Sequence, residues 1–370
     1  IVVSWLPQYH DMGLIGSYLG ILYCGGTGYY MSPLTFLQRP MIWIEAASKY
    51  HATHLQAPNF AFKLCARKFI SDQAPSTANH LDLSTIQHVI NGAEPIDEES
   101  IETFCTAFSP YGMRRDVIFP TYGLAEHTVF VCSGGTQILS VDKVKLEVDG
   151  IIVEVQPSSE DTIRKVVGCG YPSKQNVDVR IVNPETCHEV EEDCVGEIWI
   201  SSPSKASGYY NKPVETKEDF HAQLVTTNSA ASNDGYLRTG DLGFLHNNEL
   251  FLCGRRKDLI IVGGRNHYPQ DIEATAEAAS PLLRPGCCAA FSVRPSSDEE
   301  VALVVELRDV PHKQELVSVC NSIIQNLQSA IKREHSLQMS HFVLLKPRTI
   351  PKTTSGKIAR AWCRKAFLAK

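Results

Sequence analysis

The stretch from Gly235 to Asn266, GYLRTGDLGFLHNNELFLCGRRKDLIIVGGRN, brings charge, glycine and strand-like sequence together. Its apolar runs Leu250 to Cys253 and Leu259 to Val262 flank the polar segment Gly254 to Asp258, so polar groups fall at strand ends and tight turns. For any single Gly-Asp or Arg-Lys-Asp, a β-hairpin with solvated turns is the simpler interpretation. Because several such features coincide here, we expect a cleft at this stretch, with one domain before it and another after it.

The composition is that of a globular protein that handles small molecules. The 370 residues suffice for two or three domains, and 43% hydrophobic with 21% charged residues is ordinary for soluble proteins. Although 41 acidic and 35 basic residues give a net charge of -6, no block of lysine and arginine is long enough to track nucleic acid. We expect small-molecule chemistry and no nucleic-acid partner.

Cysteine and apolar patterning exclude other classes. The 12 cysteines form no CxxC pair, which argues against a zinc site or disulfide framework and predicts reduced thiols in a cytoplasmic protein. The longest apolar run, Met12 to Cys24, is broken by glycines and is too short to span a bilayer, so we expect no integral membrane segment. The sequence starts at Ile1 in mid-pattern, which indicates a fragment of a longer chain.

Strand-like and helix-like segments alternate in the first third of the chain. Ile1 to Leu6 predicts a buried strand and Met12 begins an apolar helix, which places His10 in the turn between them. Two later strands lead into Gly92-Ala93-Glu94-Pro95 and into Tyr122-Gly123. The alternation predicts an α/β fold in which helices cover a parallel sheet and ligands gather at the carboxyl ends of the strands.

The rest of the chain divides into three parts. Periodicity weakens over 133–170, which predicts an inserted segment, and short antiparallel strands over about 171–254 predict a small β-rich subdomain. Helices and strands over 255–370 predict a compact, smaller α+β unit. The predicted domains are therefore 1–254, a partial N-terminal domain, and 255–370.

Lys357 stands in a Thr-Ser-Gly-Lys sequence that invites comparison with a phosphate loop. The first glycine of that motif is absent, and Ile358 replaces the Ser or Thr that binds magnesium, so we reject a Walker site. A lysine on such a turn is usually solvated. A cation delivered from a separate domain would also stabilise developing phosphate and carboxylate charge, and this residue alone leaves both interpretations open.

Other candidate residues lie after predicted strands. Glu126 follows a turn at the start of an expected helix, where the helix dipole favours a glutamate, but it could also hold Mg²⁺ against a polyphosphate. Tyr122 offers a flat face to a purine, and Gly123 permits close backbone approach. Asp241, in an expected Thr-Gly-Asp turn, could accept two ribose hydroxyls, and Arg255 could share the ribose or bind a phosphate. Each signal is weak by itself.

Taken together, four motifs resemble one superfamily. They are Tyr122 to Glu126 (YGLAE), Tyr236 to Gly243 (YLRTGDLG), Gly254 to Asp258 (GRRKD) and Pro351 to Arg360 (PKTTSGKIAR). In this order they resemble the adenylate-forming superfamily of acyl-CoA synthetases, peptide-synthetase adenylation domains and luciferases. The resemblance spans essentially the whole chain and implies a smaller, mobile C-terminal domain.

Three further stretches resemble the fatty acyl-AMP ligases within that superfamily. These are Trp5 to Gly16 (WLPQYHDMGLIG), Asn91 to Pro95 (NGAEP) and Gly264 to Glu273 (GRNHYPQDIE). Such ligases activate long fatty acids for polyketide and lipopeptide assembly, and they carry an extra segment that disfavours coenzyme A at the place of the insertion after Glu126. Ala125, where the broader superfamily commonly has Thr, agrees with this branch.

The resemblance implies a role for each candidate residue. Tyr122 with Gly92 and Ala93 would frame the adenine, and Asp241 with Arg255 would hold the ribose. Glu94 and Gly123 would also belong to the nucleotide-binding residues. Glu126 would bind Mg²⁺, Lys357 would bridge the substrate carboxylate and the α-phosphate, and His10 would line the acyl pocket, although a lone His in such a turn more often has only local partners. Lys257 would be the hinge of the C-terminal domain. The family's loop for the β- and γ-phosphates is absent, and we expect it upstream of Ile1.

The implied function has alternatives. A fatty acid and ATP would give acyl-AMP and pyrophosphate, and the acyl group would pass to the phosphopantetheine thiol of an acyl carrier protein or carrier domain of a polyketide or peptide synthase. The alternatives are a long-chain acyl-CoA synthetase and a non-catalytic module that binds acyl-adenylate. The latter has no need for all four of the candidate residues that are intact here, which are Glu126, Asp241, Arg255 and Lys357.

Overall fold

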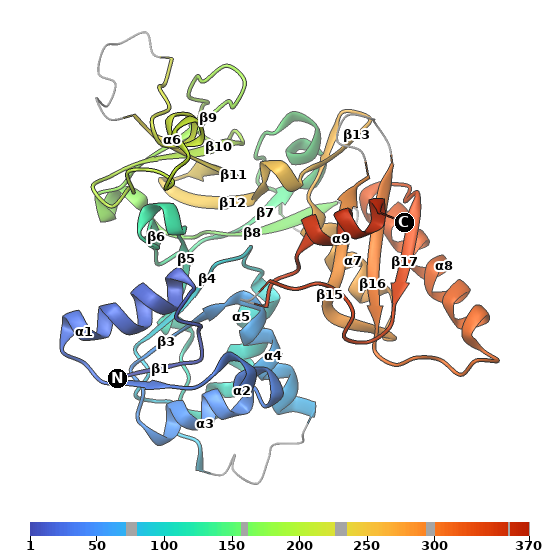
Figure 1. Ribbon diagram of the computed structural model, residues 1–370, viewed down its shortest axis with the longest axis horizontal. Helices are drawn as coiled ribbons and strands as arrows, with labels where there is room; N and C mark the ends of the chain where they lie inside the picture. Colours follow the sequence, from blue (N-terminus) through green and yellow to red (C-terminus); the bar gives the residue numbers. More distant parts are fainter. Residues whose placement is uncertain (72–79, 157–161, 226–234, 294–299, 354–355, 370) are drawn as a thin grey trace. The chain divides into compact units, whose positions relative to one another are not determined.

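The computed structural model describes residues 1–71, 80–156, 162–225, 235–293, 300–353 and 356–369. The chain divides into two compact units, which we treat separately (Figure 1). Unit 1 contains most of the chain up to Cys253. Unit 2 contains Gly254–Lys370 and also the segment Lys143–Gly150. Among the described residues, no helix is both long and apolar enough to cross a membrane.

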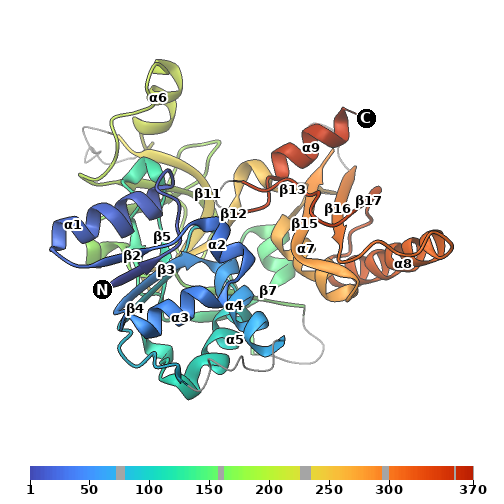
Figure 2. The same cartoon turned by 60° about the horizontal axis from the view of Figure 1, so that its bottom comes forward.

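Unit 1 is built on a six-stranded sheet of order β2-β1-β3-β4-β5-β6. Strands β1 to β5 run parallel, and β6 pairs antiparallel with β5. Helix α3 packs against β1 and α4 against β3 and α5 (Figures 1 and 2). The strands are β1 (Val2–Ser4), β2 (Gly28–Tyr30), β3 (His54–Pro58), β4 (His88–Gly92), β5 (Ile118–Tyr122) and β6 (Cys132–Ser133). The helices are η1 (Met12–Leu19), α1 (Gly20–Cys24), α2 (Pro33–Gln38), α3 (Met41–Lys49), α4 (Asn59–Ser71) and α5 (Glu98–Phe108). The α/β fold predicted from sequence is confirmed.

Aromatic packing fixes the first strand in this sheet. The indole of Trp43 donates to the carbonyl of Val3 at 3.0 Å, and Trp5 stacks on Phe36 with ring centroids 4.0 Å apart. All four side chains are buried. The turn that bears His10 therefore starts from a fixed strand, because β1 is held by its core side chains as well as by both neighbouring strands.

The β-rich part of unit 1 comes from the second half of its sequence. Its strands are β7 (Ile138–Asp142), β8 (Ile163–Val167), β9 (Asp178–Val182), β10 (Gly196–Ser201), β11 (Leu237–His246) and β12 (Glu249–Arg255), with helix α6 (Pro213–Phe220) before β11. Strands β9 to β12 form one sheet of order β12-β11-β10-β9, and β7 pairs with β8. The inserted segment therefore contains an antiparallel strand pair, although residues 157–161 lie outside the described part of it.

Unit 2 has a three-stranded sheet, β15-β16-β17, and a two-stranded one, β13-β14. The strands are β13 (Ile260–Val262), β14 (Arg265–His267), β15 (Leu283–Ser292), β16 (Val301–Leu307) and β17 (His341–Leu345). The helices are η8 (Arg256–Asp258), α7 (Pro269–Ala279), α8 (Leu316–His335) and α9 (Arg360–Leu368). Apolar residues of β15 and β16 pack with α7 and α8 on one face of the sheet, which is the α+β arrangement expected for this part of the chain.

The inserted segment contributes a buried ionic cluster to unit 2. Its π-helical turn η6 (Lys145–Asp149) packs on β14, where Arg265 donates to Glu147 at 2.6 Å. Lys143 donates to the carbonyl of Glu334 at 2.6 Å and lies 2.9 Å from Nδ1 of His335. Glu147, His267 and His335 also lie close enough together to hold a metal ion. Because the Lys143 ammonium already lies among these groups, we interpret them as an ion-pair cluster.

His267 in this cluster should make the stability of unit 2 depend on pH. Burial, with the charges of Arg265 and Lys143, lowers the pKa of His267 from 6.5 to about 4. The unfolded chain then binds more protons below pH 6.5, so stability is fully present above that pH and falls towards pH 4, by about 3 kcal/mol in total. Urea unfolding from pH 7 to pH 4 measures this.

The variant His267→Leu provides the comparison, because it lacks the titrating group. Its unfolding free energy should decline less with acid than that of the parent chain. Equal declines in the two proteins would contradict the assignment. The charged groups around His267 and its neighbours stay in place in this comparison; they are Lys143, Glu147, Arg265 and Asp271.

Candidate active site

The carboxyl ends of β4 and β5 form the first part of the site. Gly92 ends β4, and a Cβ at this position would lie 2.7 Å from the carbonyl oxygen of Thr121 on β5, so only glycine fits. Ala93 has a φ of 65°, in the left-handed region. Glu94 accepts a hydrogen bond from the backbone N–H of Phe60 at 2.5 Å, which fixes the turn after β4. These contacts hold the backbone of residues 92–94 at the edge where α/β ligands bind.

Tyr122 and Asp241 meet although they lie 119 positions apart. The hydroxyl of Tyr122, the last residue of β5, donates to Oδ2 of Asp241 at 2.8 Å. Both side chains are buried. Gly123 follows, where a Cβ would lie 1.6 Å from the carbonyl oxygen of Val129, so the chain after Tyr122 passes directly against its own backbone. The structure thus brings two of the predicted motifs into contact.

The Thr-Gly-Asp sequence is a bulge inside β11 and not the turn expected from sequence. The pairing with β10 shifts register between Glu197 and Trp199, and Gly240 takes a φ of 69°. The hydroxyl of Thr239 donates to the carbonyl of Ile198 at 2.7 Å and accepts from the N–H of Asp241 at 3.0 Å. A bulge re-aims the side chain that follows it, and here it directs Asp241 towards Tyr122.

Glu126 lies in the single 3-10 turn η5 (Ala125–His127), so the expectation of a helix here is wrong. A single turn has little dipole, so the helix dipole does not explain this glutamate. Its Oε1 accepts from the hydroxyl of Tyr209 at 2.7 Å, and among the described residues no other group bonds to its carboxylate. A half-buried carboxylate with one oxygen open suits Mg²⁺, which takes one or two protein carboxylates and fills the remaining positions with water and phosphate.

Two residues around Glu126 were not predicted as part of the site. His127 is buried, with Nδ1 2.6 Å from the carbonyl of Phe130 and Nε2 2.5 Å from the hydroxyl of Ser202, and burial lowers its pKa. The neutral His127 ring therefore holds the turn over 125–127 in place through these two hydrogen bonds. Tyr209 lies in the segment between β10 and α6, and no sequence pattern separates it from its neighbour Tyr210, which is also exposed.

His10 lies in the predicted turn between β1 and η1. Its Nδ1 lies 2.7 Å from Oδ1 of Asp11, and its backbone N–H donates to the carbonyl of Pro7 at 3.1 Å. It is half-buried. These partners are local, so they neither support nor oppose a place in an acyl pocket.

Three predicted site residues belong to unit 2. Arg255 ends β12 and Lys257 lies in η8, and both are exposed. Lys357 precedes α9 in a loop closed by pairing of Lys352 with Ile358. Residues Thr354 and Ser355 of that loop lie outside the described chain. Because Arg255 and Asp241 fall in different units, their joint hold on a ribose remains a prediction.

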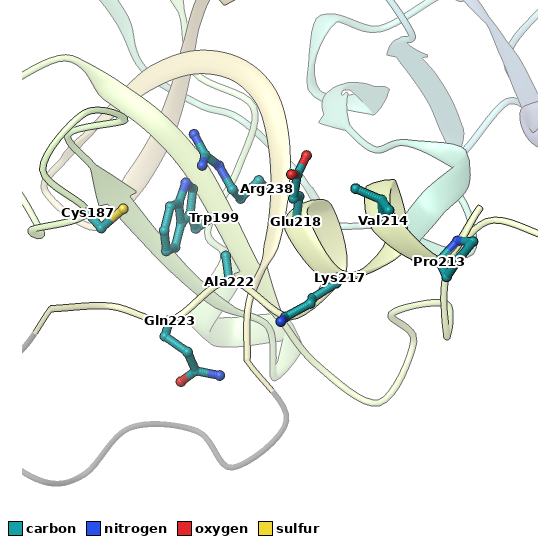
Figure 3. A pocket seen from close by; sticks show the side chains of 9 residues that line it. All are labelled: Cys187, Trp199, Pro213, Val214, Lys217, Glu218, Ala222, Gln223 and Arg238. Carbon is teal, nitrogen blue, oxygen red and sulfur yellow. The ribbon is translucent and has the colours of Figure 1, made fainter.

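A pocket of about 630 Å³ lies elsewhere in unit 1. Figure 3 shows Arg238 beside Trp199 and Lys217 with Glu218 on α6. Arg238 is already paired with the buried Glu197 at 2.7 Å, so it is not a free anion-binding group. None of the predicted site residues lines this pocket, which we leave outside the candidate site. Its lining residues are Cys187, Trp199, Pro213, Val214, Lys217, Glu218, Ala222, Gln223 and Arg238.

Comparison with known proteins decides the family. The family described as AMP-binding enzyme matches residues 1–210. The chain belongs to this AMP-binding enzyme family. Residues 257–370 match a second description, the AMP domain of Disco-interacting protein 2-like proteins. The chain passes from unit 1 to unit 2 between Cys253 and Gly254, which lies between these two matched ranges.

Curated relatives in the AMP-binding family carry fatty-acid ligase names. The chain is 42% identical to the medium-chain-fatty-acid–[acyl-carrier-protein] ligase JamA of Moorena producens (strain JHB), over 100% of this chain and 61% of that protein. It is 37% identical to the long-chain-fatty-acid–AMP ligase FadD26 of Mycobacterium marinum, over 98% of this chain and 61% of that protein. The chain thus spans about three fifths of the length of these relatives.

Solved structures of AMP-binding enzymes match the fold. A structure from a study of fatty acyl-adenylate ligases of E. coli and L. pneumophila is 34% identical, with a TM-score of 0.84 over 100% of this chain and 63% of that chain. A fatty acyl-adenylate ligase of L. pneumophila, solved with acyl adenylate and pyrophosphate, is 37% identical, with a TM-score of 0.64 over 100% of this chain and 62% of that one.

Proposed function

We propose that the protein containing this chain joins a fatty acid to ATP, releases pyrophosphate, and passes the acyl group to the phosphopantetheine thiol of a carrier protein. The observation that carries the proposal is the contact of Tyr122 with Asp241 at the carboxyl end of β5. An aromatic ring and a buried carboxylate side by side suit a purine and its ribose. The names of the relatives support a fatty acid and a carrier protein as the further substrates.

In this proposal unit 1 binds the nucleotide. Gly92 and Ala93 frame the adenine with Tyr122, and Asp241 accepts from the ribose hydroxyls. Glu126 would hold Mg²⁺, and the bound ion would neutralise phosphate charge. A carboxylate oxygen of the fatty acid attacks the α-phosphorus, and the bond to the β-phosphate breaks. His10 lines the acyl pocket in this arrangement.

Unit 2 supplies the cations. Lys357 stabilises the charge that develops between the substrate carboxylate and the α-phosphate, and Arg255 shares the ribose. Lys257 serves as the hinge about which unit 2 turns between the two half-reactions. In the second half-reaction the carrier's thiol attacks the acyl carbonyl, and AMP leaves.

Pyrophosphate release across a panel of carboxylic acids tests this proposal in the full-length protein. Release with fatty acids, followed by carrier acylation, is the expected result. Release only with amino acids or short acids would contradict the substrate class. No release with any acid, while acyl-AMP still binds, would favour the non-catalytic alternative.

A coenzyme A synthetase is the second candidate, and the inserted segment bears on it. Its strands β7 and β8 belong to unit 1, whereas Lys143–Gly150 belongs to unit 2, where Glu147 accepts from Arg265. We propose that this tether restricts how unit 2 rearranges and so disfavours coenzyme A. Replacing Val144–Asp149 by a Gly-Ser linker should therefore raise acyl-CoA formation about tenfold while acyl-AMP formation stays near normal.

The control for this replacement is the double variant Lys145→Ala/Asp149→Ala. These residues form an exposed ion pair at 3.0 Å on the same segment, and its loss should leave thiol preference unchanged. If the linker variant forms acyl-AMP normally but no more acyl-CoA than the parent protein, the tether is refuted. The preference between coenzyme A and the carrier thiol would then be set by the channel that the thiol enters.

A further inference from the structure

Glu306 is a buried carboxylate at a position where the strand pattern demands an apolar residue. Alternate residues of β16 face two cores, and Ala302 and Val304, on the same face as Glu306, join the core that contains Ile350 and Cys363. The exposed fraction of Glu306 is 0%. A charge in such a place is costly unless hydrogen bonds satisfy it fully. The contacts of Glu306 therefore indicate what it is for.

Three consecutive backbone N–H groups point at this carboxylate. Arg348 donates to Oε1 at 2.7 Å, and Thr349 and Ile350 donate to Oε2 at 3.0 and 2.9 Å. Arg284 donates to Oε1 at 2.5 Å. Converging backbone donors of this kind form an anion-binding nest. Arg348 has a φ of 63°, which is unfavourable for a residue with a side chain, and the buried anion stabilises that turn.

The carboxylate stays ionised in this setting. Burial alone would raise the pKa of Glu306, but the hydrogen bonds from Ile350, Arg284, Arg348 and Thr349 outweigh it and lower the pKa below its ordinary value. Charge-assisted bonds to a full anion are stronger than neutral ones. The ionised carboxylate of Glu306 therefore holds the turn over 348–350 at neutral pH.

The nest lies directly before the loop that carries Lys357. After Ile350 the chain forms a narrow loop in which Lys352 pairs with Ile358 and Thr353 donates to the carbonyl of Lys357 at 2.7 Å. Beyond the loop, Arg360 forms two bonds to Glu273, at 2.6 and 2.5 Å. Glu273 is also buried. A buried carboxylate thus fixes the chain on each side of Lys357.

We propose that Glu306 is a positioning residue for adenylation: by holding the turn over 348–350, it sets where the loop presents the Lys357 ammonium. The inference rests on the role proposed for Lys357 above. Glu306 acts only through that lysine, because it is buried in the core of unit 2, where it bonds to the backbone of 348–350 and to Arg284. Its loss therefore matters in the half-reaction that uses Lys357 and not in acyl transfer.

The test compares the two half-reactions in the full-length protein carrying Glu306→Gln. Glutamine keeps the shape, removes the charge and turns an amide N–H towards backbone donors. We expect kcat for pyrophosphate release to fall about tenfold, with KM for ATP unchanged and acyl transfer from supplied acyl-AMP unchanged. Equal losses in both half-reactions would show that Glu306 only stabilises the fold and would overturn the inference.

A double variant gives the decisive readout. If Glu306 acts through Lys357, Glu306→Gln/Lys357→Ala should adenylate no more slowly than Lys357→Ala alone, whereas additive losses would overturn the inference. The matched control is Glu277→Gln. Glu277 accepts from the backbone N–H of Gly286 at 2.7 Å, a bond of the same kind in the same unit, and its loss should leave both half-reactions unchanged.

Hydrogen exchange separates this inference from the proposed function. The amides of Arg348, Thr349 and Ile350 should exchange about tenfold faster in Glu306→Gln, and unchanged exchange would overturn the positioning role. If Lys357→Ala adenylates slowly but Glu306→Gln adenylates at the normal rate, the positioning role of Glu306 is rejected and the role of Lys357 is kept. Normal adenylation in Lys357→Ala would instead reject the role of the lysine, on which the inference rests.

Discussion

Replacing Lys357 with alanine should slow acyl-adenylate formation by about 100- to 1,000-fold, the usual cost of removing one preorganised donor from a developing charge. Acyl transfer from supplied acyl-AMP should change much less. The reason is that Lys357 belongs to unit 2, which is separate from the unit that carries Tyr122 and Asp241. A cation on a separate unit can stabilise charge in one arrangement of the two units and be absent in another. Single-turnover measurements of each half-reaction provide the test.

Lys365→Ala is the control for this prediction. Lys365 is an exposed lysine on α9, close to Lys357 in sequence, and its removal changes the net charge of unit 2 by the same amount. It should leave both half-reactions unchanged. If adenylation and transfer fell together in Lys357→Ala, the lysine would not bridge carboxylate and phosphate, and a general role in binding the adenylate would replace the proposal.

The α/β fold could be predicted because its signals are local. The first strand, Val2–Ser4, lies in a short apolar run, and the turn signals at Gly92 and Gly123 mark the ends of two parallel strands. Hydrophobic periodicity and turn residues depend on only a few neighbouring positions, so they can be recognised from the sequence without the fold. The membership of the chain in the AMP-binding enzymes followed from motifs of the same short range.

The partners within the site could not be predicted in this way. The Tyr122–Asp241 bond joins positions 119 apart, and the Glu126–Tyr209 bond joins positions 83 apart. Their pairing depends on sheet order and on the bulge at Gly240, which sequence periodicity does not encode. Glu126 was expected at a helix start because it follows a strand and a turn, but the left-handed residue Thr128 ends the turn at once.

Glu306 shows the opposite case, in which the pattern itself held a signal. A glutamate near the end of strand β16 interrupts a continuous apolar run, and a buried carboxylate needs partners. The sequence could not reveal that the partners are backbone groups some forty residues later. Only the fold places the backbone of residues 348–350 beside the end of β16.

Asp241→Ala should weaken binding of ATP and acyl-AMP by about 10- to 100-fold, since each hydrogen bond to a charged acceptor contributes about 1.5 to 3 kcal/mol. Calorimetry on the full-length protein measures the affinity. Asp241 is 6% exposed and accepts from Tyr122, so its removal also takes an acceptor from a buried hydroxyl. That internal loss destabilises the fold by an amount that thermal unfolding reports, and it must be separated from the loss of ribose contact.

Tyr122→Phe makes the separation. It removes the same internal hydrogen bond but keeps the Asp241 carboxylate and the aromatic ring. If Asp241 binds the ribose directly, Tyr122→Phe should weaken nucleotide binding only a few-fold, because the ring still stacks and the carboxylate still accepts. If Asp241 served only to hold Tyr122, the two variants would lose equal affinity, and the direct contact with ribose would be refuted. The difference between the two affinities is therefore the measured contribution of the carboxylate to nucleotide binding.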